Sequence, residues 1–160
     1  MGAAGPTFET ETISMAPVWR CATAVTLLTA LAGCSSPDPG PTVEQAGQTL
    51  ERHITELMET VDADETVVTD PGGKDVPCGT DGVKRTYAVK STFSRLDSNL
   101  LAEMAGTLGT TWGYKVHEAY KFGSPRTTLK LASSRTSITM ETLSQHEAVA
   151  VGETDCIPRE

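Results

Sequence analysis

The chain has 160 residues, of which 38% are hydrophobic, and it carries a formal net charge of −8. This length suits one ordinary globular domain together with a processed segment. The negative charge disfavours nucleic acid as a partner, and no segment reaches the roughly 20 consecutive apolar residues that a membrane-spanning helix needs.

The first part of the chain has the pattern of an export signal. Residues 22–33 form a short apolar run of the length found in the h-region of a signal peptide. Residues 15–20 before it form a leader with one cation, whereas Glu9 and Glu11 give the preceding segment the wrong charge for such a leader. We therefore predict that residues 1–14 are a mis-called extension and that residues 15–33 are the signal peptide.

The apolar run ends in Leu31-Ala32-Gly33-Cys34, which resembles the lipobox of bacterial lipoproteins. The resemblance implies cleavage after Gly33 and attachment of a diacylglyceryl group to the sulfur of Cys34. Acyl chains such as palmitate would then hold the secreted chain on the extracytoplasmic face of the cell membrane, because two buried chains anchor firmly. The alternatives are an ordinary signal peptide with an incidental cysteine, or a buried helix.

Residues 34–41 are predicted to form a tether between the lipid and the folded domain. Three prolines and a glycine follow the cysteine closely, and such a segment stays extended over about 20 Å. The remaining residues, 42–160, are predicted to form a single domain. Its small-residue, threonine-rich composition resembles that of small actinobacterial lipoproteins of uncharacterised function.

The four cysteines are sorted by this resemblance. With Cys21 in the leader and Cys34 acylated, Cys78 and Cys156 remain in a chain that faces an oxidising compartment, which predicts a disulfide bond between them. The alternative is a redox-active or metal-binding thiol pair, although neither cysteine has a CxxC spacing or a neighbouring histidine.

The domain begins with a predicted helix. Thr42 and Gln45 have the spacing of a capping box. The apolar residues that follow recur at steps of three and four and form one stripe: Val43, Ala46, Leu50, Ile54, Leu57, Met58 and Val61. This stripe predicts packing against a core, with a partner-binding surface as the alternative. His53 beside it is predicted to lie at the surface or the rim.

The rest of the domain alternates between strands and one further helix. Residues 66–68 predict a short strand, and residues 83–93 a longer one. Residues 94–109 predict the second helix, with Ser94 or Asp97 as its cap and Gly109 as its stop. Residues 114–122, 127–132, 137–143 and 147–151 predict the remaining strands, and their inward residues include Tyr114, Val116, Leu129, Ile138 and Met140. Short turns between these strands favour antiparallel neighbours. We predict an α+β domain with two helices on one face of an antiparallel sheet of about four to six strands.

Basic residues are concentrated at outward positions of the predicted strands. These positions hold Lys84, Lys90, Lys115, His117, Lys121 and Lys130, with several threonines among them. The ordinary interpretation is a solvated sheet face whose lysines prevent edge aggregation. The sharper hypothesis is a docking face for an anionic ligand of the cell envelope, namely lipid head groups, a teichoic-type polymer or an acidic partner.

Two charged residues interrupt the predicted apolar faces of the strands. Arg85 lies between Val83 and Tyr87, and Glu118 lies between Val116 and Tyr120. A lone charge at a core-facing position is costly unless it is paired. We expect the two either to pair with each other or to line a pocket, unless a strand end or a bulge turns them outward.

No catalytic, metal or cofactor motif is recognisable in the sequence. There is no GxSxG motif, no serine three residues before a lysine and no phosphate-binding glycine loop. His117-Glu118 and His146-Glu147 both lack the second histidine of a helical zinc site. The sequence therefore favours a non-catalytic binding module on a lipid anchor. The alternatives are a structural or accessory protein of an envelope complex and, last, an enzyme with a dispersed active site.

Overall fold

The computed structural model describes residues 40–118 and 125–159 of the chain. The predicted extension, signal peptide and Cys34, most of the tether, and Lys121 lie outside the described residues. Neither helix in the described part is long and apolar enough to cross a membrane.

Helix α1 (Val43–Glu59) forms as predicted. The side chain of Thr42 accepts a hydrogen bond from the Gln45 amide while the Gln45 side chain accepts one from the Thr42 amide, which completes the capping box. The apolar stripe faces inward, and Leu50, Ile54 and Leu57 are completely buried. Packing of this stripe against the sheet is therefore confirmed.

Six antiparallel strands form the main sheet, in the order β1-β4-β8-β7-β6-β5. They are β1 (Glu65–Asp70), β4 (Thr86–Thr92), β8 (Glu147–Thr154), β7 (Thr136–Thr142), β6 (Arg126–Leu131) and β5 (Lys115–Glu118). A second, small sheet pairs β2 (Val76–Cys78), β3 (Gly82–Lys84) and β9 (Ile157–Pro158). The predicted α+β class and antiparallel sheet are confirmed.

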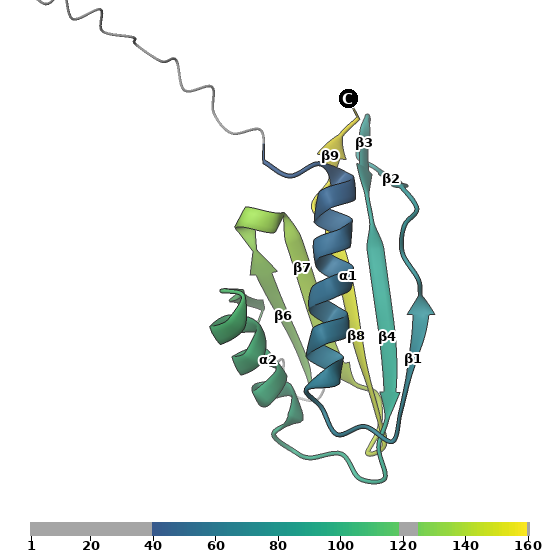
Figure 1. Ribbon diagram of the computed structural model, residues 1–160, viewed down its shortest axis with the longest axis vertical. Helices are drawn as coiled ribbons and strands as arrows, with labels where there is room; N and C mark the ends of the chain where they lie inside the picture. Colours follow the sequence, from purple (N-terminus) through teal and green to yellow (C-terminus); the bar gives the residue numbers. More distant parts are fainter. Residues whose placement is uncertain (1–39, 119–124, 160) are drawn as a thin grey trace, which may run out of the picture. The chain divides into compact units, whose positions relative to one another are not determined.

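Both helices lie on the same face of the main sheet (Figure 1). α1 packs on β4, β8 and β7, whereas α2 (Leu100–Thr111) packs on β6 and β7. The core between the two layers contains the inward residues of the strands, among them Val89, Leu129, Ile138 and Met140. A short 3-10 turn, η1 (Ala132–Ser134), connects β6 to β7 and contacts α1.

The second helix differs from its prediction at both ends. It begins at Leu100, where Asp97 accepts a hydrogen bond from the Asn99 amide before the helix instead of capping its first turn. Gly109 lies within the helix and does not stop it. The stop is Gly113, which has a φ of +80° and places Tyr114 so that its N–H donates to the Leu108 carbonyl.

The strands also depart from the sequence pattern in two places. The predicted strand over residues 83–93 is interrupted at Arg85, so that β3 belongs to the small sheet and β4 to the main sheet. Val116, expected to face inward, is 58% exposed because β5 is an edge strand with an irregular register between Val116 and Glu118.

The predicted disulfide bond between Cys78 and Cys156 is present, with a Cα–Cα distance of 5.8 Å. It joins β2 to the segment between β8 and β9, so the small sheet holds the C-terminal end of the chain against the domain. A chain end without such a bond generally frays.

Candidate functional site

No helix among the described residues covers the second face of the main sheet. Directly opposed residues of neighbouring strands share a face, so the strand register defines which side chains lie there. One row runs Thr86, Glu153, Ser137, Lys130, Lys115; a second runs Ala88, Val151, Thr139, Thr128; a third runs Val67, Lys90, Val149, Glu141, Arg126. We call this surface the open face. Glutamates alternate with the basic residues on it, so it is not a uniformly basic surface.

Two of the predicted lysines are already paired with glutamates of β8. Lys84 Nζ lies 2.6 Å from Glu153 Oε2, and Lys90 Nζ lies 3.0 Å from Glu147 Oε1. Exposed pairs of this kind contribute little to stability, but they cancel the charge that an anionic ligand would be drawn to. Lys84 and Lys90 are therefore poor anchors for such a ligand.

Lys115 and Lys130 are placed differently, because they lie directly opposite each other on β5 and β6. Both are exposed, and within the described part of the chain neither forms an ion pair. Like charges directly opposite each other destabilise a sheet, so an anion bound between the two ammonium groups would relieve this repulsion. His117, predicted on the same face, is exposed at the irregular part of the β5 register.

A hollow of about 490 Å³ adjoins the lysine pair. Besides the two lysines, its lining consists of Gly113, Leu131, Ala132, Ser133, Thr136 and Asp155. The Ser133 side chain supplies a hydroxyl donor, while Asp155 is the one carboxylate among the described residues of the lining. We call this place the Lys115/Lys130 hollow. Two ammonium groups and a hydroxyl group are suited to the oxygens of a phosphate or phosphodiester.

The Lys115/Lys130 hollow lies at the end of the domain where the described chain begins. A Cβ atom on Gly40 would be 3.1 Å from Arg135 Nη2, so Gly40 packs against the Arg135 side chain. Arg135 directly precedes Thr136 of the hollow, and its carbonyl accepts a hydrogen bond of 2.7 Å from the Asp155 amide. Figure 1 shows the start of α1 and the turn between β6 and β7 at this same end.

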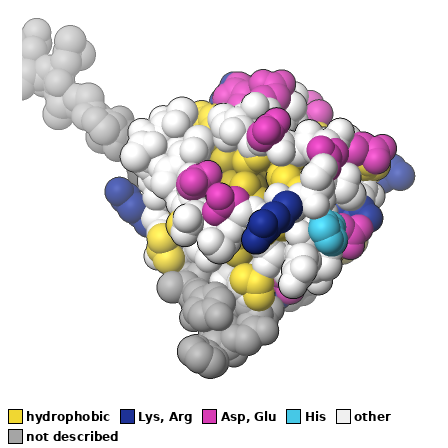
Figure 2. Space-filling view, turned by 90° about the horizontal axis from the view of Figure 1, so that it is seen from below, with side chains coloured by type: hydrophobic (Ala, Val, Ile, Leu, Met, Phe, Trp, Pro, Cys, Tyr) yellow, Lys and Arg dark blue, Asp and Glu magenta, His cyan; other side chains and the backbone are white. Residues whose placement is uncertain are grey.

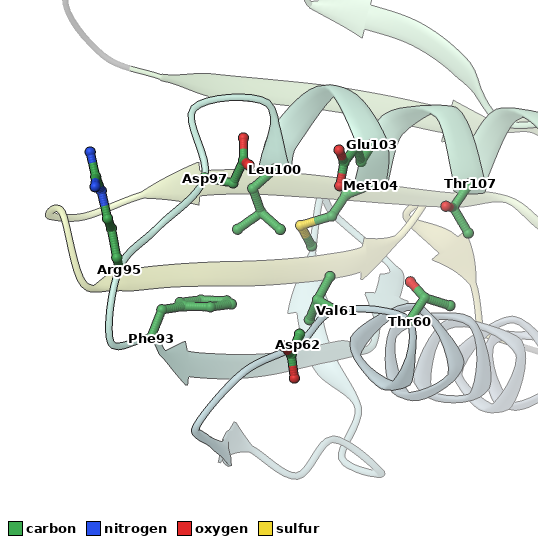
Figure 3. A pocket seen from close by; sticks show the side chains of 10 residues that line it. All are labelled: Thr60, Val61, Asp62, Phe93, Arg95, Asp97, Leu100, Glu103, Met104 and Thr107. Carbon is green, nitrogen blue, oxygen red and sulfur yellow. The ribbon is translucent and has the colours of Figure 1, made fainter.

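A cleft of about 430 Å³ opens at the opposite end, between the end of α1 and the start of α2 (Figures 2 and 3). Phe93, Val61, Leu100 and Met104 converge on its interior, whereas Arg95 extends away from them (Figure 3). Three carboxylates also line the cleft: Asp62, Asp97 and Glu103. Figure 2 shows acidic side chains around hydrophobic ones on this end of the molecule. This negative rim disfavours an anionic ligand here.

The expected pairing of Arg85 with Glu118 is wrong. Arg85 Nε donates to Asp75 Oδ1 at 2.9 Å, and its side chain is only 18% exposed because it packs beside Gly47 of α1. Glu118 lies on β5, which is separated from β4 by three strands, and its side chain is outside the described residues. Arg85 therefore joins the start of α1 and the loop at Asp75 at the junction between the two sheets.

His53, predicted at the surface or the rim, is instead buried. It is 4% exposed, and its Nδ1 lies 3.2 Å from the Tyr114 hydroxyl. That hydroxyl lies 2.8 Å from Thr136 Oγ1, which in turn lies 2.7 Å from Ser134 Oγ. The ring also stacks on Trp112 at a centroid distance of 4.7 Å. The polar chain thus links α1 to the strand and turn beside the Lys115/Lys130 hollow.

Because His53 is buried, we expect the free energy of unfolding of the domain to decrease in mild acid. Burial, followed by the positive charge of Arg52, lowers the pKa of His53 below its ordinary value of 6.5 in the folded chain. The unfolded chain therefore takes up the proton first. Stability should be full above pH 6.5 and decrease below it, by at most about 1.4 kcal/mol per pH unit, in urea unfolding followed from pH 7.5 to 5.

The variant His53→Gln should show a shallower decrease over this range, and His117→Gln, which removes an exposed ring, is the matched control. Equal slopes for the native chain and His53→Gln would contradict the assignment of the decrease to His53.

Groups for metal binding do not converge in the described residues. No three histidine, cysteine, aspartate or glutamate side chains come together there in a way that holds a metal ion.

Neither a protein-family model, nor a curated protein, nor a solved structure matches the chain. The function must therefore be inferred from this chain's own residues.

Proposed function

We propose that the chain is an exported lipoprotein, anchored through Cys34, whose domain is a non-catalytic binding module for phosphate-bearing components of the cell envelope. The lipobox-like segment at residues 31–34 and the Cys78–Cys156 disulfide support export to an oxidising compartment. The observation that carries the ligand class is the pair of opposed lysines at the Lys115/Lys130 hollow, neither of which forms an ion pair within the described part of the chain.

The position of the hollow fits this role. Gly40, the first described residue, packs beside Arg135 next to the hollow. Only five residues separate Cys34 from Gly40, and an extended chain of that length covers roughly 20 Å. A lipid on Cys34 would therefore hold the hollow close to the anionic surface of the bilayer. Phosphodiester groups of lipid heads and of envelope polymers share the chemistry that two ammonium groups recognise.

The test compares binding of two anionic probes by the acylated chain in neutral detergent micelles. One probe is phosphatidylglycerol added to the micelles, and the other is soluble poly(glycerol phosphate). Each lysine near an anionic surface contributes about 1 kcal/mol, so Lys115→Gln/Lys130→Gln should weaken binding by about 30-fold in calorimetric titration. The probe that binds more tightly identifies the source of the phosphodiester.

The matched control is Lys84→Gln/Lys90→Gln, which removes the same charge from lysines that are already paired. Its binding should change by less than about threefold, since these lysines offer no free charge. An equal loss in both variants would assign binding to the general positive charge of the domain and not to the hollow. Mass spectrometry of the N-terminal peptide provides the check on the anchor, and an unacylated Cys34 would contradict it.

A further inference from the structure

Strand β1 forms one edge of the main sheet, and within the described residues only β4 pairs with it (Figure 1). Its first five residues are all exposed, and its sequence, ETVVTD, contains neither lysine nor proline. Natural proteins place lysine or proline on edge strands as protection, because alternate N–H and C=O groups of an edge strand point outward and can pair with another strand. The β1 edge lacks both of these protections, and its register with β4 is regular from Glu65 to Val68 and irregular between Val68 and Asp70.

An apolar groove of about 250 Å³ runs beside this edge, between α1 and β1. Its lining is Thr55, Met58, Glu59, Thr66, Val68, Tyr87 and Val89. Val68 leaves 48% of its surface exposed, whereas Tyr87 and Val89 beneath it are nearly buried. A strand added to β1 would direct alternate side chains toward this side of the sheet, where an apolar side chain would cover Val68.

Negative charges lie at the two ends of β1 and beside the groove, whereas Lys90 of β4 lies opposite Val67 on the open face. Glu65 and Asp70 lie at the two ends of β1, and Glu59 of α1 lines the groove. Hydrogen bonds from the Thr86 hydroxyl and the Gly72 amide lower the pKa of Asp70, which keeps its carboxylate ionised. A partner segment with basic residues at its ends would therefore be attracted at both ends of β1.

A second copy of this chain is a poor partner for the same edge. Two β1 strands paired with each other would bring the carboxylates of Glu65 and Asp70 from both copies to one edge. Like charges on paired strands are destabilising, so these residues work against self-association.

We infer that β1 is a docking edge for an extended segment of another protein, with β-branched or other apolar residues in its centre and basic residues at its ends. The segment pairs with the outward N–H and C=O groups of β1 and covers Val68 with an apolar side chain. This surface lies at the opposite edge of the sheet from the Lys115/Lys130 hollow and takes a polypeptide, so it goes beyond the proposed function.

The test uses the full chain in neutral detergent micelles and three capped seven-residue peptides. The first has alternating valine and threonine with a lysine at each end, the second has glutamate at each end, and the third is the lysine peptide with a central proline. The lysine peptide should bind at least about tenfold more tightly than either of the others at low salt. Hydrogen–deuterium exchange should then slow in residues 65–69.

Two variants make the test specific to this edge. Glu65→Lys should weaken binding of the lysine peptide by about fivefold, since it exchanges an attraction for a repulsion. Glu103→Lys makes the same charge change on the exposed surface of α2 and should leave binding unchanged.

Three results would overturn the inference: equal binding of the lysine and proline peptides, protection of amides outside β1, or no binding. Protection of β1 that rises with protein concentration, without peptide, would assign the edge to a second copy instead.

Discussion

The variant Cys78→Ser/Cys156→Ser should unfold with a free energy lower than that of the native chain by about 4.5 kcal/mol. The disulfide closes a loop between residues 78 apart in the sequence, and opening this loop restores the conformational entropy of the unfolded chain. The folded state loses in addition the bond that holds β9, a strand of only two residues, in the small sheet. Urea unfolding of both proteins measures the difference.

The native chain treated with a reductant is the matched control for this variant. Once reduced, it should unfold at nearly the same urea concentration as the serine variant. In the variant, hydrogen exchange should also quicken at Arg159, whose amide donates to the Asp81 carbonyl beside the small sheet. If the reductant left the urea midpoint of the native chain unchanged, a stabilising role for the disulfide would be contradicted.

The variant Gly152→Ala should lower the free energy of unfolding by about 2 to 3 kcal/mol. Gly152 is the point of β8 against which α1 rests. A Cβ atom there would lie 2.7 Å from Ile54 Cδ1 and 3.0 Å from Leu50 Cγ. Both side chains are completely buried, so neither has room to move aside without displacing the helix. Thermal or urea unfolding measures the effect.

The same substitution in helix α2 should have the opposite sign. Gly106 is exposed, and a Cβ atom there would meet nothing within 4 Å. Because alanine is the better helix former, Gly106→Ala should raise the free energy of unfolding by about 0.5 to 1 kcal/mol. If both variants were stabilised, close contact between α1 and β8 at Gly152 would be refuted.

Local signals predicted the elements of this domain well. Three features depend only on residues that are close in the sequence: the capping box at Thr42, the spacing of Leu50, Ile54 and Leu57, and the alternation around Val89. Each could therefore be predicted without knowledge of the fold. His53 was readable too, since it lies three residues after Leu50 on the same stripe, but its polar ring suggested the surface.

The errors arose where a distant partner decides the structure. The break at Arg85 depends on Asp75 and on Thr154 Oγ1, which accepts a hydrogen bond from the Arg85 amide. The exposure of Val116 depends on β5 being the last strand of the sheet. Neither partner is visible from the alternation of apolar residues alone.

The candidate site shows the same division. Outward positions were predicted for the lysines, but strand order decides which of them meet glutamates. β8 lies between β4 and β7 and brings Glu147 beside Lys90, while β5 and β6 bring two lysines face to face. The pairing of strands, not the composition of a face, separates a neutralised lysine from one available to a ligand.

The strand order also bears on when the molecule can take shape. The first helix rests on β8, which is the last long strand to leave the ribosome and also pairs with both β4 and β7. A nascent chain that lacks residues 147–154 has no β8, which is the strand on which α1 packs and the strand that joins β4 to β7. We therefore expect such a polypeptide to stay loose until β8 has been synthesised.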